Sequence, residues 1–283
     1  MARISIISLA FFLVSTCVLQ AQIAGVPNDS VAFSIKMAQL EQMDEMVLEN
    51  PIMAVGKSFL GMPYVEKTLE IGETESLIIN LKGFDCTTYV ENVLAFSLLL
   101  QNNGRQFENF AKNLETIRYR NGELNGYPSR LHYFSEWIRN NEQKGLVKDI
   151  TNSLGGKEHQ KHINFMGTHR ALYPFLADDQ NYKEMRIVEK ELAGERLCIL
   201  AQDEIENNED KIRSGDIIAL ATSIDGLDVT HTGFAIEQNG RIHLLHASSA
   251  GSVRITQEPL VDYLKKIKNN IGIIVARPTL LSP

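Results

Sequence analysis

The chain has 283 residues, enough for one large domain or two small ones, and either would bury a hydrophobic core without disulfide support. Hydrophobic residues make up 44% and charged residues 22%, a globular composition that excludes disordered, collagen-like and coiled-coil proteins. The 28 basic and 35 acidic side chains give a net charge of -7, so no nucleic-acid partner is expected.

Residues 1–21 have the pattern of a secretory signal peptide. Arg3 precedes an apolar run, 4–19, which is short for a membrane span and typical of a signal-peptide core. We therefore predict an exported protein with no stable membrane insertion after signal removal. A lipoprotein anchored through Cys17 is the less favoured alternative, because Thr16 is bulky for that processing site.

A helical arm is predicted over residues 22–54. Asp29 and Ser30 can cap a helix that runs to Met43, and Pro51 marks its end or a new start.

The strongest helical pattern of the chain opens at Cys86, after short predicted strands at 69–71 and 77–81. The following region, 102–195, is long, polar and predicted to be mostly helical. Its candidate helices are 107–119, 131–141 and 182–192.

From residue 196 the pattern changes to strands. Their connections are too short for crossover helices, which predicts a mostly antiparallel sheet. Helices followed by strands indicate an α+β fold. The predicted strands are 196–200, 216–221, 229–237, 241–248, 252–256 and 271–277.

Cys86 is the candidate nucleophile. With Cys17 in the signal, only Cys86 and Cys198 remain, and they either pair or leave one working thiol. At the start of a helix, unpaired backbone N–H groups and the helix dipole stabilise a thiolate and can hold an oxyanion. A small buried packing residue is the alternative interpretation.

Two histidines are candidates for the base and its orienting partner. Asn239 and Gly240 predict a two-residue hairpin turn. The resulting register places His231 and His246 on one face as diagonal neighbours, at about 7–8 Å between backbones. Two ordinary sheet histidines are the alternative.

The face that carries His231 also carries Gly233 and Ala235, which are small enough for a helix to approach. Placing the start of the Cys86 helix against this face brings together a thiol, a base and an orienting group. Cysteine–histidine hydrolases need that arrangement.

Four short blocks occur along the chain in a fixed order. They are Gly61-Met62-Pro63-Tyr64, Asp85-Cys86, Gly215-Asp216 and the two histidine strands. In this order they resemble the NlpC-type branch of papain-like cysteine hydrolases, bacterial enzymes that trim cell-wall peptides. The resemblance implies a papain-like α+β domain over 55–283, with 102–195 inserted and the cysteine helix packed on an antiparallel sheet.

The resemblance also implies roles for single residues. Cys86 is the nucleophile, His231 the general base and His246 the residue that orients it, and Tyr64 shapes the site beside the thiol. No cofactor or metal is implied. A metal site at His159, His162 and His169 is disfavoured, because no acidic residue or cysteine stands at a ligand position between them.

A narrower resemblance concerns the substrate. The family's Asp-Cys-Ser-Gly reads Asp85-Cys86-Thr87-Thr88 here, which does not favour recognition of a free L-Ala amine. The stretches 126–134 and 164–169 are similar to a divergent subfamily of N-acetylmuramoyl-L-alanine amidases. Such enzymes cleave the amide between N-acetylmuramic or anhydromuramic acid and L-Ala, here through a thioester on Cys86. The candidate substrate-binding residues are Tyr64, Asp85, Arg130, Tyr133 and His169.

The expected partner is a muropeptide or peptidoglycan, and the expected form is a periplasmic monomer. Two alternatives stay open: an endopeptidase that cuts between D-glutamate and the diamino acid of the stem peptide, and a cell-wall-binding protein whose catalytic group is vestigial.

Overall fold

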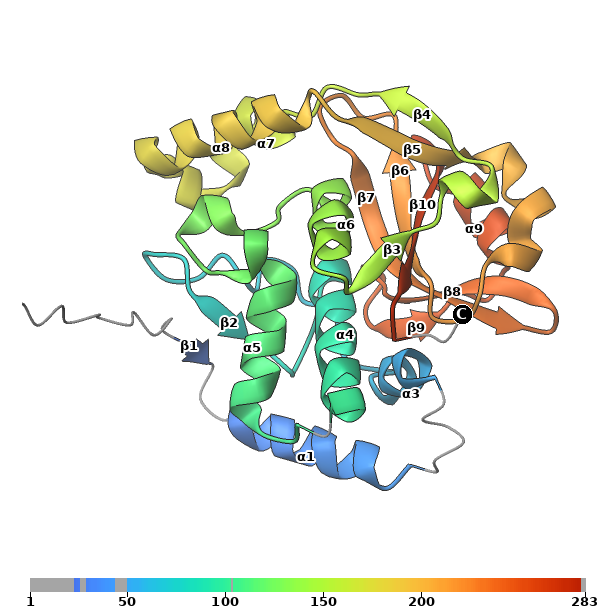
Figure 1. The fold of residues 1–283 in the computed structure, drawn as a ribbon, viewed down its shortest axis with the longest axis horizontal. Coiled ribbons are helices and arrows are strands. Elements are labelled where there is room, and N and C mark those ends of the chain that lie inside the picture. Colours follow the sequence, from blue (N-terminus) through green and yellow to red (C-terminus); the bar gives the residue numbers. More distant parts are fainter. Residues whose placement is uncertain (1–22, 26–28, 44–49, 103, 281–283) are drawn as a thin grey trace, which may run out of the picture.

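The computed structural model describes residues 23–25, 29–43, 50–102 and 104–280 (Figure 1). The predicted signal peptide, 1–21, and Cys17 lie outside the described residues. Among the helices that are described, none has both the length and the apolar composition that a membrane crossing requires.

The sheet has the strand order β4-β5-β10-β6-β7-β8-β9, with β3 also paired to β10, and all its ladders are antiparallel. The predicted α+β fold is thus confirmed. Two of its strands come from the region 102–195, which was expected to be mostly helical. The strands are β3 (Val147–Asp149), β4 (Lys157–Gln160), β5 (Arg196–Ala201), β6 (Ile217–Thr222), β7 (Val229–Gln238), β8 (Arg241–Ala247), β9 (Val253–Ile255) and β10 (Asn270–Pro278).

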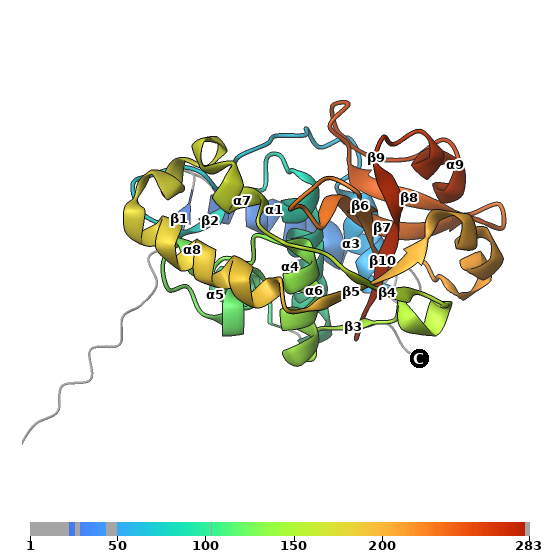
Figure 2. The same cartoon turned by 90° about the horizontal axis from the view of Figure 1, so that it is seen from above.

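The predicted helices form with small shifts in their ends. Helices α4, α5 and α6 lie on one side of the sheet and α9 on the other (Figures 1 and 2). The helices are α1 (Asp29–Glu41), α3 (Pro51–Ser58), α4 (Cys86–Asn102), α5 (Phe107–Arg118), α6 (Phe134–Gln143), α7 (Phe165–Thr168), α8 (Asp179–Leu192) and α9 (Leu260–Lys265).

The N-terminal region differs from its prediction in two places. The arm contains a short strand, β1 (Ile23–Gly25), which pairs in parallel with β2 (Leu77–Ile79). The predicted strand at 69–71 is wrong, since these residues form a turn and loop. Leu69 and Glu70 line a cavity beside α4 instead of joining a sheet.

Helix α4 is buried on several sides, which explains its strong apolar pattern. Tyr89 packs its ring 5.8 Å from that of Phe234 in β7 and donates a hydrogen bond of 3.0 Å to the carbonyl of Gly56 in α3. Farther along, Phe96 lies 4.4 Å from Phe110 of α5, centroid to centroid. The helix is therefore fixed from the sheet, α3 and α5 at once, and its first residue is held firmly in place.

The hairpin of β7 and β8 has the predicted register. Asn239 and Gly240 adopt φ angles of 53° and 76°, as a type I′ turn requires, and Gln238 pairs with Arg241. At the other end of β7, the ladder with β6 shifts by one residue between the pairs His231–Leu220 and Val229–Ala221. Such a bulge re-aims a side chain, and here it lies next to His231.

Candidate active site

Asp85 caps the helix that carries the nucleophile. Its Oδ1 accepts hydrogen bonds from the N–H of Thr88 (2.7 Å) and from the Thr88 hydroxyl (2.8 Å). In return, the Asp85 N–H donates to the Thr88 hydroxyl oxygen at 3.0 Å. This reciprocal pair satisfies two backbone donors at the helix start. Asp85, predicted to bind substrate, is thereby committed to the helix cap, although it also lines the cavity described below.

Tyr64 lies beside the nucleophile because backbone hydrogen bonds join its segment to the segment before α4. The N–H of Phe84 donates to the Pro63 carbonyl (3.0 Å), and the N–H of Val65 donates to the Phe84 carbonyl (3.0 Å). Gly83 allows this approach, since a Cβ there would lie 2.5 Å from the Val65 side chain. Burial, followed by the nearby Cys86 and Asp85, raises the pKa of Tyr64 to about 12.

The Cys86 thiol is partly exposed and unpaired, as is that of Cys198, so the two cysteines do not form a disulfide. Hydrogen bonding from the backbone of Thr232 and from the side chain and backbone of Thr87 favours the thiolate of Cys86 and lowers its pKa. Burial and the charge of Asp85 nevertheless raise its pKa to about 12. The expected stabilisation of a thiolate by the helix start is therefore wrong for the resting site, where desolvation outweighs it.

His231 and His246 meet as the register predicted. The Nε2 of His231 lies 2.6 Å from the Nδ1 of His246, and the two rings are perpendicular. Burial lowers the pKa of His231 to about 4 and, with the positive charge of neighbouring groups, that of His246 to about 3. Both imidazoles are therefore neutral near neutral pH. Since the Nε2 of His231 is engaged, its Nδ1 is the nitrogen left for chemistry.

The helix does not pack on the face of β7 that was expected. Helix α4 packs on the face of Phe234, whereas the His246 ring contacts Tyr263 of α9, with centroids 5.6 Å apart. The link between Cys86 and β7 is hydrogen bonding to the backbone of Thr232, the residue next to His231 in the strand. Gly233 is small for another reason, because a Cβ there would meet the Leu245 carbonyl oxygen at 2.7 Å and the Cβ of His246 at 2.8 Å.

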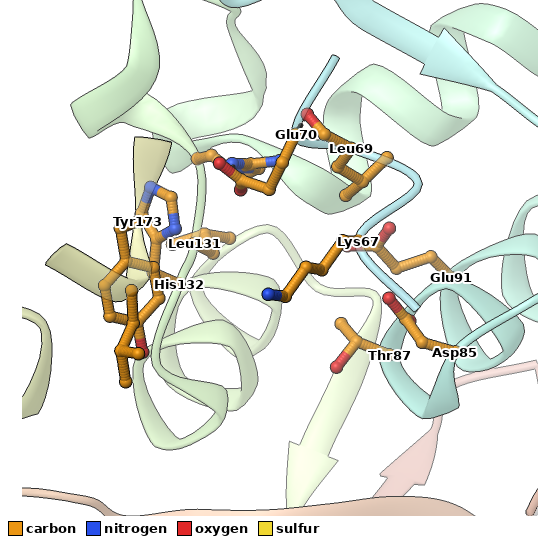
Figure 3. A pocket seen from close by; sticks show the side chains of 11 residues that line it. Lys67, Leu69, Glu70, Asp85, Thr87, Glu91, Leu131, His132 and Tyr173 are labelled. Atoms are coloured by element: carbon orange, nitrogen blue, oxygen red, sulfur yellow. Dashed lines mark hydrogen bonds and ion pairs between the residues drawn. The ribbon is translucent and has the colours of Figure 1, made fainter. Parts of the chain in front are cut away.

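A cavity of about 230 Å³ opens beside the start of α4 (Figure 3). Asp85 and Thr87, the two neighbours of Cys86, both line it. The other lining residues come from two loops, from α4 and from the segment before α6: Lys67, Leu69, Glu70, Glu91, Arg130, Leu131, His132, Leu172 and Tyr173.

Arg130 lines this cavity, but its charge is already neutralised. The guanidinium forms an ion pair with Glu70, lies 3.6 Å from Glu75 through Nε, and donates to the Leu69 carbonyl at 3.2 Å. It is 5% exposed. Arg130 therefore forms part of the cavity wall and holds the 69–75 loop in place. The sequence had suggested instead that it binds a substrate carboxylate.

Tyr133 and His169 do not line the cavity. The Tyr133 hydroxyl is buried, donates to Glu189 of α8 (2.8 Å) and accepts from the N–H of Met166 (2.9 Å), so it joins three helices. His169 is exposed and stacks on Phe165, with centroids 4.0 Å apart. Neither position offers a free polar group at the cysteine, and the prediction that they touch substrate finds no geometric support.

Sequence reasoning missed several residues around the thiol. Thr87 was noted only as a departure from the family pattern, yet its hydrogen bonding lowers the pKa of the Cys86 thiol. Lys67 and Tyr173 lie in loops without periodicity, and no sequence signal marks them. Tyr263 belongs to α9, a helix too short to be read from the pattern. Within the described part of the chain, no three His, Cys, Asp or Glu side chains are grouped to hold a metal ion.

Comparison with known proteins places this geometry in context. The model of the AmiA-like family, described as N-acetylmuramoyl-L-alanine amidase-like, matches residues 54–273. A crystal structure of an N-acetylmuramoyl-L-alanine amidase from Bacteroides uniformis is 36% identical, with a TM-score of 0.77 over 82% of this chain and 99% of that one. A Bacteroides fragilis structure, described provisionally as a xylanase, is 42% identical, with a TM-score of 0.75 over 79% of this chain and 99% of that one.

A Legionella pneumophila protein shares the fold at 23% identity, with a TM-score of 0.68 over 88% of this chain and 94% of that one. No curated protein matches the chain.

Proposed function

Because the chain belongs to the AmiA-like family of N-acetylmuramoyl-L-alanine amidase-like proteins, we propose that it hydrolyses the amide between muramic acid and the L-Ala of a stem peptide. The substrate is a peptidoglycan fragment whose sugar is N-acetylmuramic or anhydromuramic acid. Two observations carry the proposal: the thiol at the start of α4 is hydrogen-bonded to the backbone of Thr232 in β7, and the adjacent residue of that strand, His231, pairs with His246. Export to the periplasm belongs to the same proposal and agrees with a cell-wall substrate.

In the first step, the sulfur of Cys86 attacks the lactyl carbonyl carbon while its proton passes to the Nδ1 of His231. Because burial disfavours a thiolate–imidazolium pair, the proton moves as the S–C bond forms. Because the N–H of Thr88 is held by the Asp85 cap and that of Tyr89 by the Asp85 carbonyl, the backbone N–H of Cys86 is the donor that holds the oxyanion. The C–N bond then breaks, and His231 returns the proton to the departing L-Ala amine, leaving a thioester on Cys86.

In the second step, His231 takes a proton from water, and the hydroxide attacks the thioester carbon. The C–S bond breaks and the proton returns to the sulfur, which restores the thiol and releases the muramic acid carboxyl group. His246 keeps the His231 ring in position through the 2.6 Å contact. The mechanism needs no metal and no cofactor.

The pH profile tests the role of His231. Since burial lowers the pKa of His231 to about 4, the base remains unprotonated well below the ordinary histidine value of about 6.5. We therefore expect the acid limb of kcat/KM to fall near pH 4. The unfolded chain binds protons below about pH 6.5 that the folded site excludes, so stability also decreases as the pH falls through this window. Circular dichroism at each pH separates the two effects, and an acid limb at 6.5 or above would contradict the assignment.

The bond that is cut is identified by digesting purified muropeptides and measuring the masses of the products by mass spectrometry. The amidase releases the complete stem peptide and a sugar free of peptide. The endopeptidase alternative leaves L-Ala and D-glutamate on the sugar. The xylanase description of one neighbour does not transfer to this site, where Glu91, Glu70 and Asp85 are engaged by Arg118, Arg130 and the helix cap.

A further inference from the structure

The cavity beside Cys86 has an apolar wall and a polar wall. Leu69, Leu131, Leu172 and the ring of Tyr173 supply the first, and charged side chains supply the second. Aromatic and aliphatic surface next to hydrogen-bonding groups suits a ligand with both apolar and polar faces. At about 230 Å³ the cavity is smaller than the pockets of drug-sized ligands, and one ring with its substituents is the appropriate scale.

Two polar atoms that line this cavity, the Nζ of Lys67 and the Oε2 of Glu70, have no hydrogen-bond partner among the described residues. Lys67 reaches from its loop toward the middle of the cavity, and among the described residues no side chain forms a hydrogen bond or ion pair with its ammonium (Figure 3). The Oε2 of Glu70 is buried without a hydrogen bond. A ligand that offers an acceptor to Lys67 and a donor to Glu70 would satisfy both groups. The unmade hydrogen bond is costly at Glu70, whose Oε2 is buried, whereas Lys67 is exposed and free to turn to a ligand.

The charges in the walls largely cancel, so the cavity does not select an anion. Glu70 is paired with Arg130, and Glu91 is paired with Arg118 at 2.7 Å. The carboxylate of Asp85, held in the helix cap, is unfavourable for a second carboxylate nearby. A neutral ligand with hydroxyl or acetamide groups fits this balance, because each such group can donate and accept.

The two halves of a muropeptide differ in this respect. Once its lactyl carboxyl is part of the amide, the sugar is uncharged and carries hydroxyl and acetamide groups. The stem peptide carries free carboxylates. We propose that the cavity binds the sugar half of the substrate, and that Lys67 and Tyr173 determine this specificity. The inference rests on the proposed function, which it deepens by assigning a subsite.

The backbone of Lys67 supports a specific role for this residue. Its φ angle is 59°, in the left-handed region that residues other than glycine and asparagine rarely adopt. Backbone strain of this kind is typical of sites where a side chain must be presented to a ligand.

The test compares two substrates that share the scissile amide: N-acetylmuramoyl-L-Ala-D-Glu and D-lactoyl-L-Ala-D-Glu, which lacks the sugar ring. We expect wild-type protein to prefer the first. Lys67→Met should lower the ratio of the two kcat/KM values by about tenfold, the effect of one hydrogen bond to a charged group. Activity on the lactoyl peptide should change little, and Lys67→Arg should restore part of the preference. Tyr173→Leu should also lower the ratio.

Lys82→Met is the matched control, because Lys82 is an exposed lysine on the segment before Cys86 and lies outside the cavity. It should leave the ratio unchanged. Equal ratios for wild type and Lys67→Met, with both substrates cleaved, would overturn the inference while leaving the amidase proposal intact. So would a loss of activity on both substrates in equal measure.

A binding measurement decides the inference even if neither substrate is cleaved, an outcome that would refute the proposed function. Calorimetry with Cys86→Ala protein should detect the neutral amide of N-acetylmuramic acid, and Cys86→Ala/Lys67→Met protein should bind it about tenfold more weakly. No binding of the amide sugar would overturn the inference. Binding of the dipeptide L-Ala-D-Glu that depends on Lys67 would assign the cavity to the peptide half and overturn it as well.

Discussion

Replacement of Cys86 by alanine is expected to reduce amide hydrolysis by at least about a thousandfold, and His231→Ala should come close to the same loss. Both residues act on the same proton and the same carbon, so the double variant should lose little more than either single one. The measurement is kcat on a purified muropeptide, with folding checked by circular dichroism.

Cys198→Ser is the control for this experiment. Cys198 is the other free thiol among the described residues, and it lies in β5, where it lines a different cavity. Its replacement should leave kcat unchanged. Full activity in the Cys86→Ala protein would contradict the mechanism. Thiol labelling is less informative than activity, because a thiol with a pKa of about 12 reacts slowly at neutral pH in a working enzyme as well.

The second large effect is on stability. Glu91 of α4 and Arg118 of α5 form a buried ion pair at 2.7 Å, with both side chains 2% exposed. Arg118 also donates to the carbonyl of Ile78 in β2 at 2.6 Å, so the pair joins three elements. Removing one partner leaves the other charge buried and unpaired, so Glu91→Leu or Arg118→Met should each cost about 3–5 kcal/mol of unfolding free energy.

The double variant Glu91→Leu/Arg118→Met should recover most of that loss, because the desolvation penalty disappears with both charges. Urea denaturation of the four proteins gives the coupling energy between the two side chains. Single variants that lose less than about 1 kcal/mol, or losses that simply add, would show that the pair is not a coupled buried unit.

The parts of the site that depend on local sequence could be predicted. The Asn239-Gly240 turn allows few backbone conformations, so it set the register and the meeting of His231 with His246. The start of α4 at Cys86 followed from its apolar pattern, and the structure confirms it. Each of these features is determined within about twenty residues of chain.

Features that depend on burial could not be predicted in the same way. The charge state of Cys86 was expected to follow the helix start, but it follows the loss of water around the sulfur, which depends on the folded protein. Strands β3 and β4 are three and four residues long and carry charged residues, so no periodicity marks them before they pair with β10 and β5. The choice of face for α4 likewise arises from packing of Tyr89 against Phe234.

The loops around the cavity are the least predictable part. Lys67 and Tyr173 are far apart in sequence and line the same cavity because Arg130 holds the 69–75 loop and because Phe175, in the other loop, stacks on Tyr127. Arg130 was predicted to bind substrate because a guanidinium suits a substrate carboxylate. Its two carboxylate partners, Glu70 and Glu75, come from a loop that is distant in sequence, and Glu70 lies where a strand was predicted.

The central claim is that Cys86 cleaves the muramoyl–L-Ala amide. It is tested most directly by digesting a muropeptide in heavy-oxygen water, with wild-type and Cys86→Ala protein side by side, and locating the label by mass spectrometry. The account predicts one heavy oxygen in the lactyl carboxyl group of the released sugar, an unlabelled stem peptide, and no product from the Cys86→Ala protein. Label in a D-glutamate carboxyl group, or turnover by the Cys86→Ala protein, would contradict it.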